Sequence, residues 1–130
     1  MFWKKQKFND EDVGELTFEV GYWNFTSLLG SEELLIDVEG SIIEPDADAL
    51  QQAKRVLKNI ESIHDEANKF INEQGISHFT KGMEHTTLDR FSSYKEIGKY
   101  DVRFGLSNWD DAIIVVHFQS NKPSDISLSD

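Results

Sequence analysis

The sequence has no cysteine and no long apolar run, and each absence excludes a class of protein. Without cysteine the chain has no disulfide, no thiol nucleophile and no thiolate ligand for zinc. The longest uninterrupted apolar run, Ala112–Val116, is far shorter than the roughly 20 residues of a membrane-spanning helix. The basic segment Met1–Phe8 is not followed by an apolar stretch, so it does not resemble a signal peptide. We therefore expect a cytoplasmic protein that binds no membrane.

Basic residues are few: 13 Lys and Arg stand against 24 Asp and Glu, which gives a formal net charge of -11. An excess of negative charge argues against nucleic acid as a partner. The 130 residues are the usual size of one domain, and 38% hydrophobic residues suffice for a core. We expect a single α+β domain over residues 1–119. Residues 120–130 are mostly Ser, Asp, Asn and Pro and are expected to be a disordered tail.

The chain has no Lys or Arg between Phe8 and Ala53, although acids and bases are nearly balanced after Ala53. This segment holds half of the carboxylates of the chain: Asp10, Glu11, Asp12, Glu15, Glu19, Glu32, Glu33, Asp37, Glu39, Glu44, Asp46 and Asp48. A one-sided charge pattern of this kind predicts an acidic surface on the folded domain.

Alternating residues predict strands with one buried face over 15–20 and 34–38. A further strand is predicted over 22–26, which is rich in residues that favour strands. Glu15 and Glu19 fall on the polar face of the first segment, and Asp37 and Glu39 fall on the polar face of the last in chain order. If these strands share a sheet, its solvent face carries all four carboxylates.

A long helix is predicted after Pro45, because apolar residues recur there at spacings of three and four: Leu50, Ala53, Leu57, Ile60, His64, Ala67 and Ile71. Asp46 or Asp48 can cap its start, and Gly75 can end it. Lys99–Leu106 and Ala112–Phe118 resemble further strands. The predicted fold is an antiparallel β-sheet, made of an N-terminal meander and C-terminal strands, packed against one long central helix.

The sequence contains no recognisable catalytic or cofactor motif, and its catalytic residues remain unassigned. The G-x-S-x-G and G-x-G-x-x-G patterns are both missing. A calcium loop starting at Glu44 would need Gly and Glu where Ala49 and Arg55 stand. The spacing of His78 and His85 matches no metal-ligand pattern. We expect no metal and no cofactor.

The first functional hypothesis is a non-enzymatic, acidic protein-binding domain that takes a basic partner protein. Its outward carboxylates would speed association with such a partner, and tryptophans would anchor it. The partner-binding residues of this hypothesis are Glu15, Glu19, Asp37, Glu39, Trp23 and Trp109. Two simpler readings stay open: the carboxylates only keep the protein soluble, and the tryptophans belong to the core.

The second hypothesis is a small hydrolase or ligand-binding domain with a pocket between helix and sheet. His64, His85 or His117 would work in that pocket beside a carboxylate.

The segment from Gly14 to about Glu73 resembles a group of small bacterial domains of unknown function. The residues that carry the resemblance are Gly14, Leu16, Phe18, Trp23, the Leu34–Val38 strand and the Ala49–Ile71 helix, with Tyr100–Phe104 and Trp109–Asp111 fitting the same layout. Some small acidic proteins of similar appearance are immunity proteins that accompany polymorphic toxins. The resemblance thus implies a basic toxin domain as one kind of partner.

Overall fold

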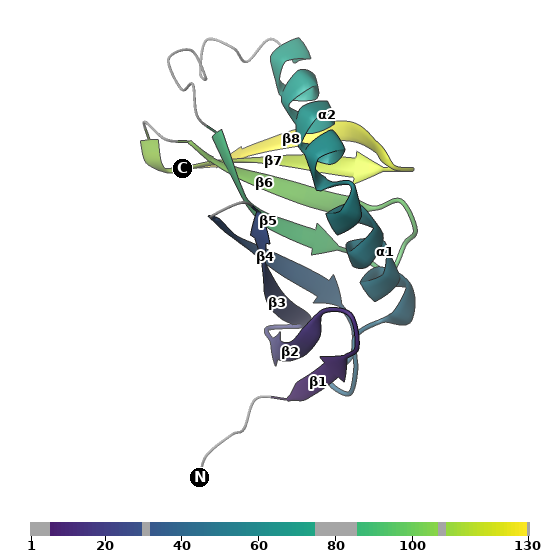
Figure 1. Cartoon of the computed structure of the whole chain (residues 1–130). Helices are drawn as coiled ribbons and strands as arrows, with labels where there is room; N and C mark the ends of the chain where they lie inside the picture. The colour runs from purple at the N-terminus through teal and green to yellow at the C-terminus, as the bar shows by residue number, and fades with distance from the viewer. Residues whose placement is uncertain (1–5, 30–31, 75–85, 107–108, 130) are drawn as a thin grey trace.

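The computed structural model describes residues 6–29, 32–74, 86–106 and 109–129 and has an α+β fold (Figure 1). Within these ranges eight strands form one sheet in chain order, and two helices lie between the fourth and fifth strands. The elements are β1 (Lys7–Asp10), β2 (Gly14–Glu19), β3 (Tyr22–Leu29), β4 (Glu32–Glu39), α1 (Ala47–Lys58), α2 (Ile60–Glu73), β5 (Thr86–Ser93), β6 (Tyr100–Leu106), β7 (Trp109–Gln119) and β8 (Lys122–Ser129).

The sheet is mostly antiparallel, as the sequence predicts. One pair differs: β4 and β5 run parallel, with Leu35 opposite Arg90 and Asp37 opposite Ser92. A parallel pair cannot be closed by a hairpin, and here the chain between the two strands contains α1 and α2. The crossover therefore joins an N-terminal four-stranded meander to a C-terminal one.

The single long helix of the prediction is wrong, because Asn59 divides it into α1 and α2. The Asn59 side chain donates from Nδ2 to the Arg55 carbonyl at 3.0 Å, and its backbone N–H donates to the Val56 carbonyl at 3.0 Å. Asparagine competes for backbone groups in this way and is therefore unfavourable inside a helix. Neither helix, nor any other in the described ranges, is long and apolar enough to cross a membrane.

The disordered tail of the prediction is also wrong, because Lys122–Ser129 forms β8 at the edge of the sheet. Ser120 and Asn121 have positive φ angles of 53° and 65° and make the tight turn that returns the chain from β7. β8 pairs antiparallel with β7, and Ile126 packs against the core. A polar composition suits an edge strand, which has one partner and much contact with water.

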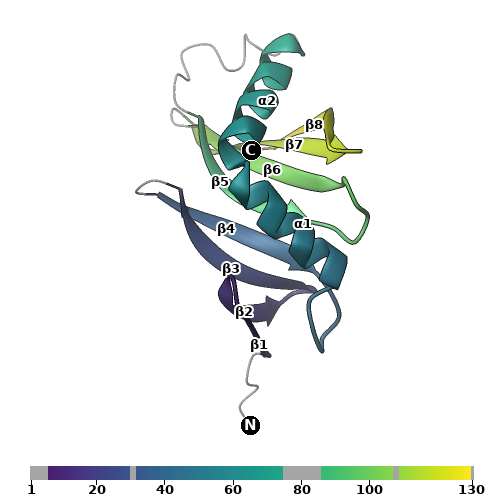
Figure 2. The same ribbon diagram turned by 45° about the vertical axis from the view of Figure 1, so that its right-hand side comes forward.

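Both helices cover the same face of the sheet, where the core lies (Figure 2). Alternate residues of each strand enter this core, so that Leu34, Ile36 and Val38 of β4 are all buried. The Tyr100 and Phe118 rings stack there with centroids 4.7 Å apart. The opposite face of the sheet, which we call the open face, is covered by neither helix.

Gln52 ties α1 to the loop between β5 and β6. Its side chain is buried, and its Nε2 donates to the Lys99 carbonyl at 2.8 Å while its Oε1 accepts from the Gly98 N–H at 2.6 Å. Nε2 also lies 3.2 Å from the Ser93 hydroxyl. One side chain thus satisfies several polar groups that water cannot reach.

We expect Gln52→Ala to lower the free energy of unfolding by about 2–3 kcal/mol, because the buried Gly98 N–H loses its acceptor and the Lys99 carbonyl loses one of its two donors. Gln51→Ala is the matched control, since Gln51 is the exposed neighbour on the same helix. Urea denaturation followed by circular dichroism measures both. Equal stability of the two variants would contradict this role for Gln52.

Candidate functional site

One row of polar side chains crosses the whole open face. Its members stand opposite one another in the strand register, one from each strand from β1 to β8: Lys7, Thr17, Asn24, Asp37, Ser92, Asp101, His117 and Asp125. Their neighbours along the strands point to the helices, so the period of two that builds the core also builds this row. Polar side chains of neighbouring strands therefore lie beside one another across the open face.

Asp37 is held inside the protein, although the sequence predicts it as an outward carboxylate. Its side chain lies on the open face but is only 6% exposed, and its two oxygens accept from Arg90 Nε at 2.5 Å and Nη2 at 3.1 Å. The Ser92 hydroxyl donates to it at 3.2 Å. The hydrogen bonds that Arg90 donates to Asp37 raise the pKa of Arg90. The expectation that Asp37 contacts a partner is wrong, because an internal ion pair occupies it.

Trp23 is also not a partner anchor, since its side chain is 0% exposed. It packs against the rings of Phe8 and Phe18, and its indole N–H donates to the Ser41 carbonyl at 2.7 Å. The core reading of this tryptophan is the correct one. The side chain of Trp109 lies outside the part of the chain that the structure describes.

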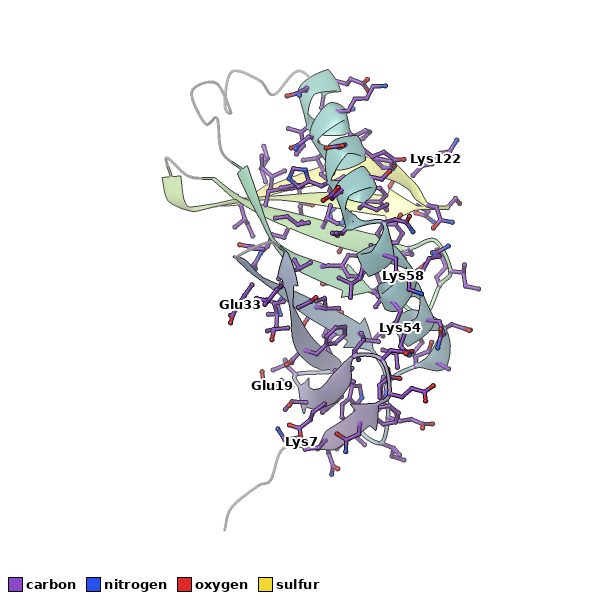
Figure 3. All side chains as sticks on the ribbon, viewed as in Figure 1. Lys7, Glu19, Glu33, Lys54, Lys58 and Lys122 are labelled. Carbon is purple, nitrogen blue, oxygen red and sulfur yellow. The ribbon has the colours of Figure 1, made fainter. Side chains whose placement is uncertain are left out.

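The other three predicted carboxylates are more accessible. Glu15 is exposed and pairs with Lys7 Nζ at 3.1 Å, and Glu19 is exposed at the end of β2 (Figure 3). Glu39 is half-buried, and its Oε1 accepts from the Lys95 backbone N–H at 2.8 Å. Glu15, Glu19 and Glu39 thus share one sheet, as predicted, on its open face.

Part of the negative charge of the first third is neutralised by a base from just beyond it. Lys54 of α1 contacts Asp10 at 2.9 Å and Asp12 at 2.8 Å (Figure 3). Burial acts to raise the pKa of Asp10, but hydrogen bonds from Lys54 and from the Asp12 and Val13 N–H groups outweigh it and lower that pKa. Hydrogen bonds to Asp12 and Asp10 raise the pKa of Lys54.

A hydroxyl, an imidazole and a carboxylate meet on the C-terminal half of the open face. The Ser127 Oγ lies 2.6 Å from His117 Nε2, and His117 Nδ1 lies 2.7 Å from Asp101 Oδ1. The second oxygen of Asp101 accepts from the Tyr94 hydroxyl at 2.5 Å. We call Asp101, His117 and Ser127 the acid–imidazole–hydroxyl array. An open depression of about 440 Å³ adjoins it.

Sequence reasoning singled out His117 but placed it in a pocket between helix and sheet. The structure puts it on the open face, whereas His64 lies on the helix side with its ring centroid 5.4 Å from that of Phe104. The two histidines therefore do not share a site, and His78 and His85 lie outside the described residues. In the described ranges no group of His, Asp and Glu could hold a metal ion.

The array could not be found from the sequence, because its members come from three strands and show no motif. Asp101 and Ser127 lie on β6 and β8, on either side of His117 in β7. Only the strand order and register bring them together.

Exposed apolar side chains gather at one end of the sheet. Val20, Ile42, Ile43 and Ile97 are large, exposed and located in the turn between β2 and β3, the loop after β4 and the loop after β5. We call these four residues the apolar loop end. In the sequence the apolar pair Ile42-Ile43 is interpreted as a continuation of the strand over 34–38, but β4 ends at Glu39 and the pair lies in the following loop.

Hydrogen bonds hold these loops next to one another. The Lys95 N–H donates to Glu39 at the end of β4, and the Asn121 N–H donates to the Gly98 carbonyl at 3.0 Å. The indole of Trp23 binds the carbonyl of Ser41 in the loop after β4. These loops follow the same end of their strands, because Glu19 and Glu39 both stand opposite Tyr22, and Val38 stands opposite Ser93. The four residues of the apolar loop end therefore share one end of the sheet.

Val20 is unusual within it, because its φ angle is +50° and its side chain is 96% exposed. It forms a two-residue turn with Gly21, whose φ angle is +88°. Positive φ at both central residues is the pattern of a type I′ turn, for which Asn is favoured and a β-branched residue is strained. Neither packing nor backbone conformation accounts for a valine at this position.

Comparisons of the chain with protein-family models, with curated proteins and with solved structures found no match. The resemblance to small bacterial domains therefore stays a prediction.

The three tyrosines of the chain should all ionise above the ordinary pKa of 10. Burial is the main cause for Tyr22, Tyr94 and Tyr100, and it raises the pKa of Tyr100 to about 12. The hydrogen bond and charge of Asp101 raise the pKa of Tyr94 further. Because folding raises the pKa of each phenol, the neutral tyrosines contribute fully to the free energy of unfolding below pH 10. That contribution is lost as the pH rises through the folded pKa values.

Absorbance at 295 nm, titrated with base in the native protein and in urea, measures the phenolates. We expect fewer phenolates at pH 10 in the native protein than in urea, where the tyrosines titrate ordinarily. In Asp101→Asn one phenol should ionise earlier than in the parent protein. A native tyrosine with a pKa of 10 would contradict the geometry.

Proposed function

We propose that this protein is a protein-binding domain whose partner is basic, and that the apolar loop end contacts that partner. The observation that carries the proposal is the gathering of Val20, Ile42, Ile43 and Ile97 at one end of the sheet. Exposed apolar side chains scattered singly need no explanation, but a group within one region is typical of an interaction site.

The charges around the apolar loop end favour a basic partner. Among the described residues of these loops and the adjoining strand and helix ends, carboxylates outnumber the two lysines, Lys95 and Lys99. The carboxylates are Glu19, Glu39, Glu44, Asp46, Asp48 and Glu96. An apolar centre with a charged border is the usual anatomy of a protein interface. The border would steer a basic protein, and the apolar side chains would hold it.

The backbone of Val20 gives independent support. A strained, exposed, β-branched residue lowers stability, and such strain tends to be retained where it serves function. A basic toxin domain, held as an immunity protein holds its toxin, is the partner that fits the sequence resemblance. Asp37 pairs with Arg90 and Trp23 is buried, so neither is available to a partner. The binding surface instead lies on the loops beside Glu19 and Glu39.

The paired change Ile42→Ser and Ile43→Ser should weaken partner binding at least about tenfold, because buried apolar anchors carry most interface energy. The partner is first captured from lysate of the source organism at low and moderate salt and identified by mass spectrometry. Its affinity for each purified variant is then measured by calorimetry. The matched control is Leu28→Ser, which removes a 73% exposed apolar side chain near the other end of β3.

Charge reversal provides a second comparison. Glu39→Lys with Glu44→Lys should slow association and flatten its salt dependence, whereas Glu33→Lys, at the other end of β4, should not (Figure 3). Loss of binding in the Leu28 and Glu33 controls, with full binding in the loop variants, would refute this surface.

Val20→Asn should raise the free energy of unfolding by about 1 kcal/mol, because Asn tolerates positive φ. The same change should weaken partner binding, since it removes the exposed isopropyl group. Thermal unfolding and calorimetric titration measure the two effects. Higher stability with unchanged binding would show that Val20 is no part of the interface.

A further inference from the structure

The acid–imidazole–hydroxyl array is a connected group of reactive side chains on the open face. The Asp101 carboxylate can only accept hydrogen bonds, so His117 Nδ1 at 2.7 Å must carry the proton. In the neutral ring Nε2 then holds a lone pair, and it faces the Ser127 hydroxyl at 2.6 Å. These are the distances and the tautomer that activation of a serine requires.

The carboxylate is itself fixed in place. Its second oxygen accepts from the Tyr94 hydroxyl at 2.5 Å, and its side chain is 19% exposed. The imidazole is 35% exposed, so Asp101 orients the ring while part of it stays accessible to a substrate. An orienting acid, a base and a hydroxyl thus follow one another from β6 to β8.

The edge position of β8 leaves backbone N–H groups that face away from β7. The Ile126 N–H donates to the Asp125 side chain at 2.8 Å, so it does not point to β7. Alternation along a strand turns the N–H of Leu128 the same way. Leu128 directly follows Ser127, and its N–H is open at the sheet edge to an oxygen on a substrate.

We propose that Ser127 is a nucleophile that His117 activates and Asp101 orients, and that it takes small carboxylic esters. Ser127 Oγ forms a bond to the ester carbonyl carbon and gives its proton to His117 Nε2. The tetrahedral adduct then breaks its bond to the alcohol oxygen, which leaves with that proton. Water, deprotonated by His117, hydrolyses the acyl-serine and restores the hydroxyl.

The surroundings define the class of ester. Tyr94, Lys99, Gln119 and Asp125 line the adjoining depression, so a small polar group fits there better than a long acyl chain. Asp125 stands opposite His117 in the register and repels anions. Lys99 lines the same depression, so we expect a small ester whose polar groups contact charges of both signs. This activity rests on other residues than the apolar loop end, so either proposal can fail without the other.

A fluorophosphonate probe tests the reactivity directly, because Ser127 Oγ would form a bond to phosphorus while fluoride leaves. Intact-protein and peptide mass spectrometry then locate the label. We expect one label, on Ser127, and its loss in Ser127→Ala. The matched control is Ser124→Ala, since Ser124 lies on the same strand but donates to the His117 carbonyl rather than to the ring.

The roles of His117 and Asp101 are tested by the rate at which the probe labels Ser127. His117→Gln and Asp101→Asn should each slow labelling at least about tenfold, the second because it permits the wrong tautomer. Hydrolysis of p-nitrophenyl acetate should fall in the same order, and thermal unfolding verifies that each variant is folded. A folded Ser127→Ala that hydrolyses the ester as fast as the parent would overturn the proposal.

A purely structural array gives a different outcome. If the contacts only tie β8 to β7, the probe labels no serine or labels several equally, and that result also overturns the proposal. Labelling of Ser127 that persists at the parent rate in Asp101→Asn would remove the orienting role of the carboxylate.

Discussion

The one-sided covering of the sheet is the constraint from which the rest of the structure follows. Because α1 and α2 seal only one face, alternate residues of every strand enter the core and the others face water. Polar side chains of the open face therefore form hydrogen bonds and ion pairs with side chains of neighbouring strands. The Asp37–Arg90 pair and the acid–imidazole–hydroxyl array are two examples of such contacts.

The same constraint separates the two proposed functions in space. Side chains in the middle of the sheet bind one another, as Asp37 does, so they have little left to offer a large partner. Loops at the sheet end have fewer neighbours and present Ile42, Ile43 and Val20 to solvent. The array combines both situations: the Asp101 carboxylate is held by its neighbours, whereas the Ser127 hydroxyl lies on an edge strand. A protein contact and a small-molecule reaction can thus occupy different parts of one small domain.

The sequence predicted the elements whose burial depends on local pattern. The strands around Leu16, Ile36 and Val102 and the helical stripe through Ala53 were recognisable because apolar period and secondary structure agree there. The sequence did not predict the features that depend on contacts beyond the local pattern, such as β8 and the division of the helix. β8 looked like a tail because an edge strand needs few apolar residues, and one helix was expected because a single Asn59 does not interrupt the stripe.

The sequence by itself determined that the chain is acidic, that it forms an α+β fold and that Glu15, Glu19, Asp37 and Glu39 share the polar side of their strands. Only the tertiary structure decided which of these carboxylates meets a base, because Arg90 lies on a strand that reaches Asp37 through a parallel crossover. It likewise placed Ser127 against His117 and gathered the apolar loop end. Side-chain alternation is a local property of the backbone, whereas strand order is set by the packing of the whole chain.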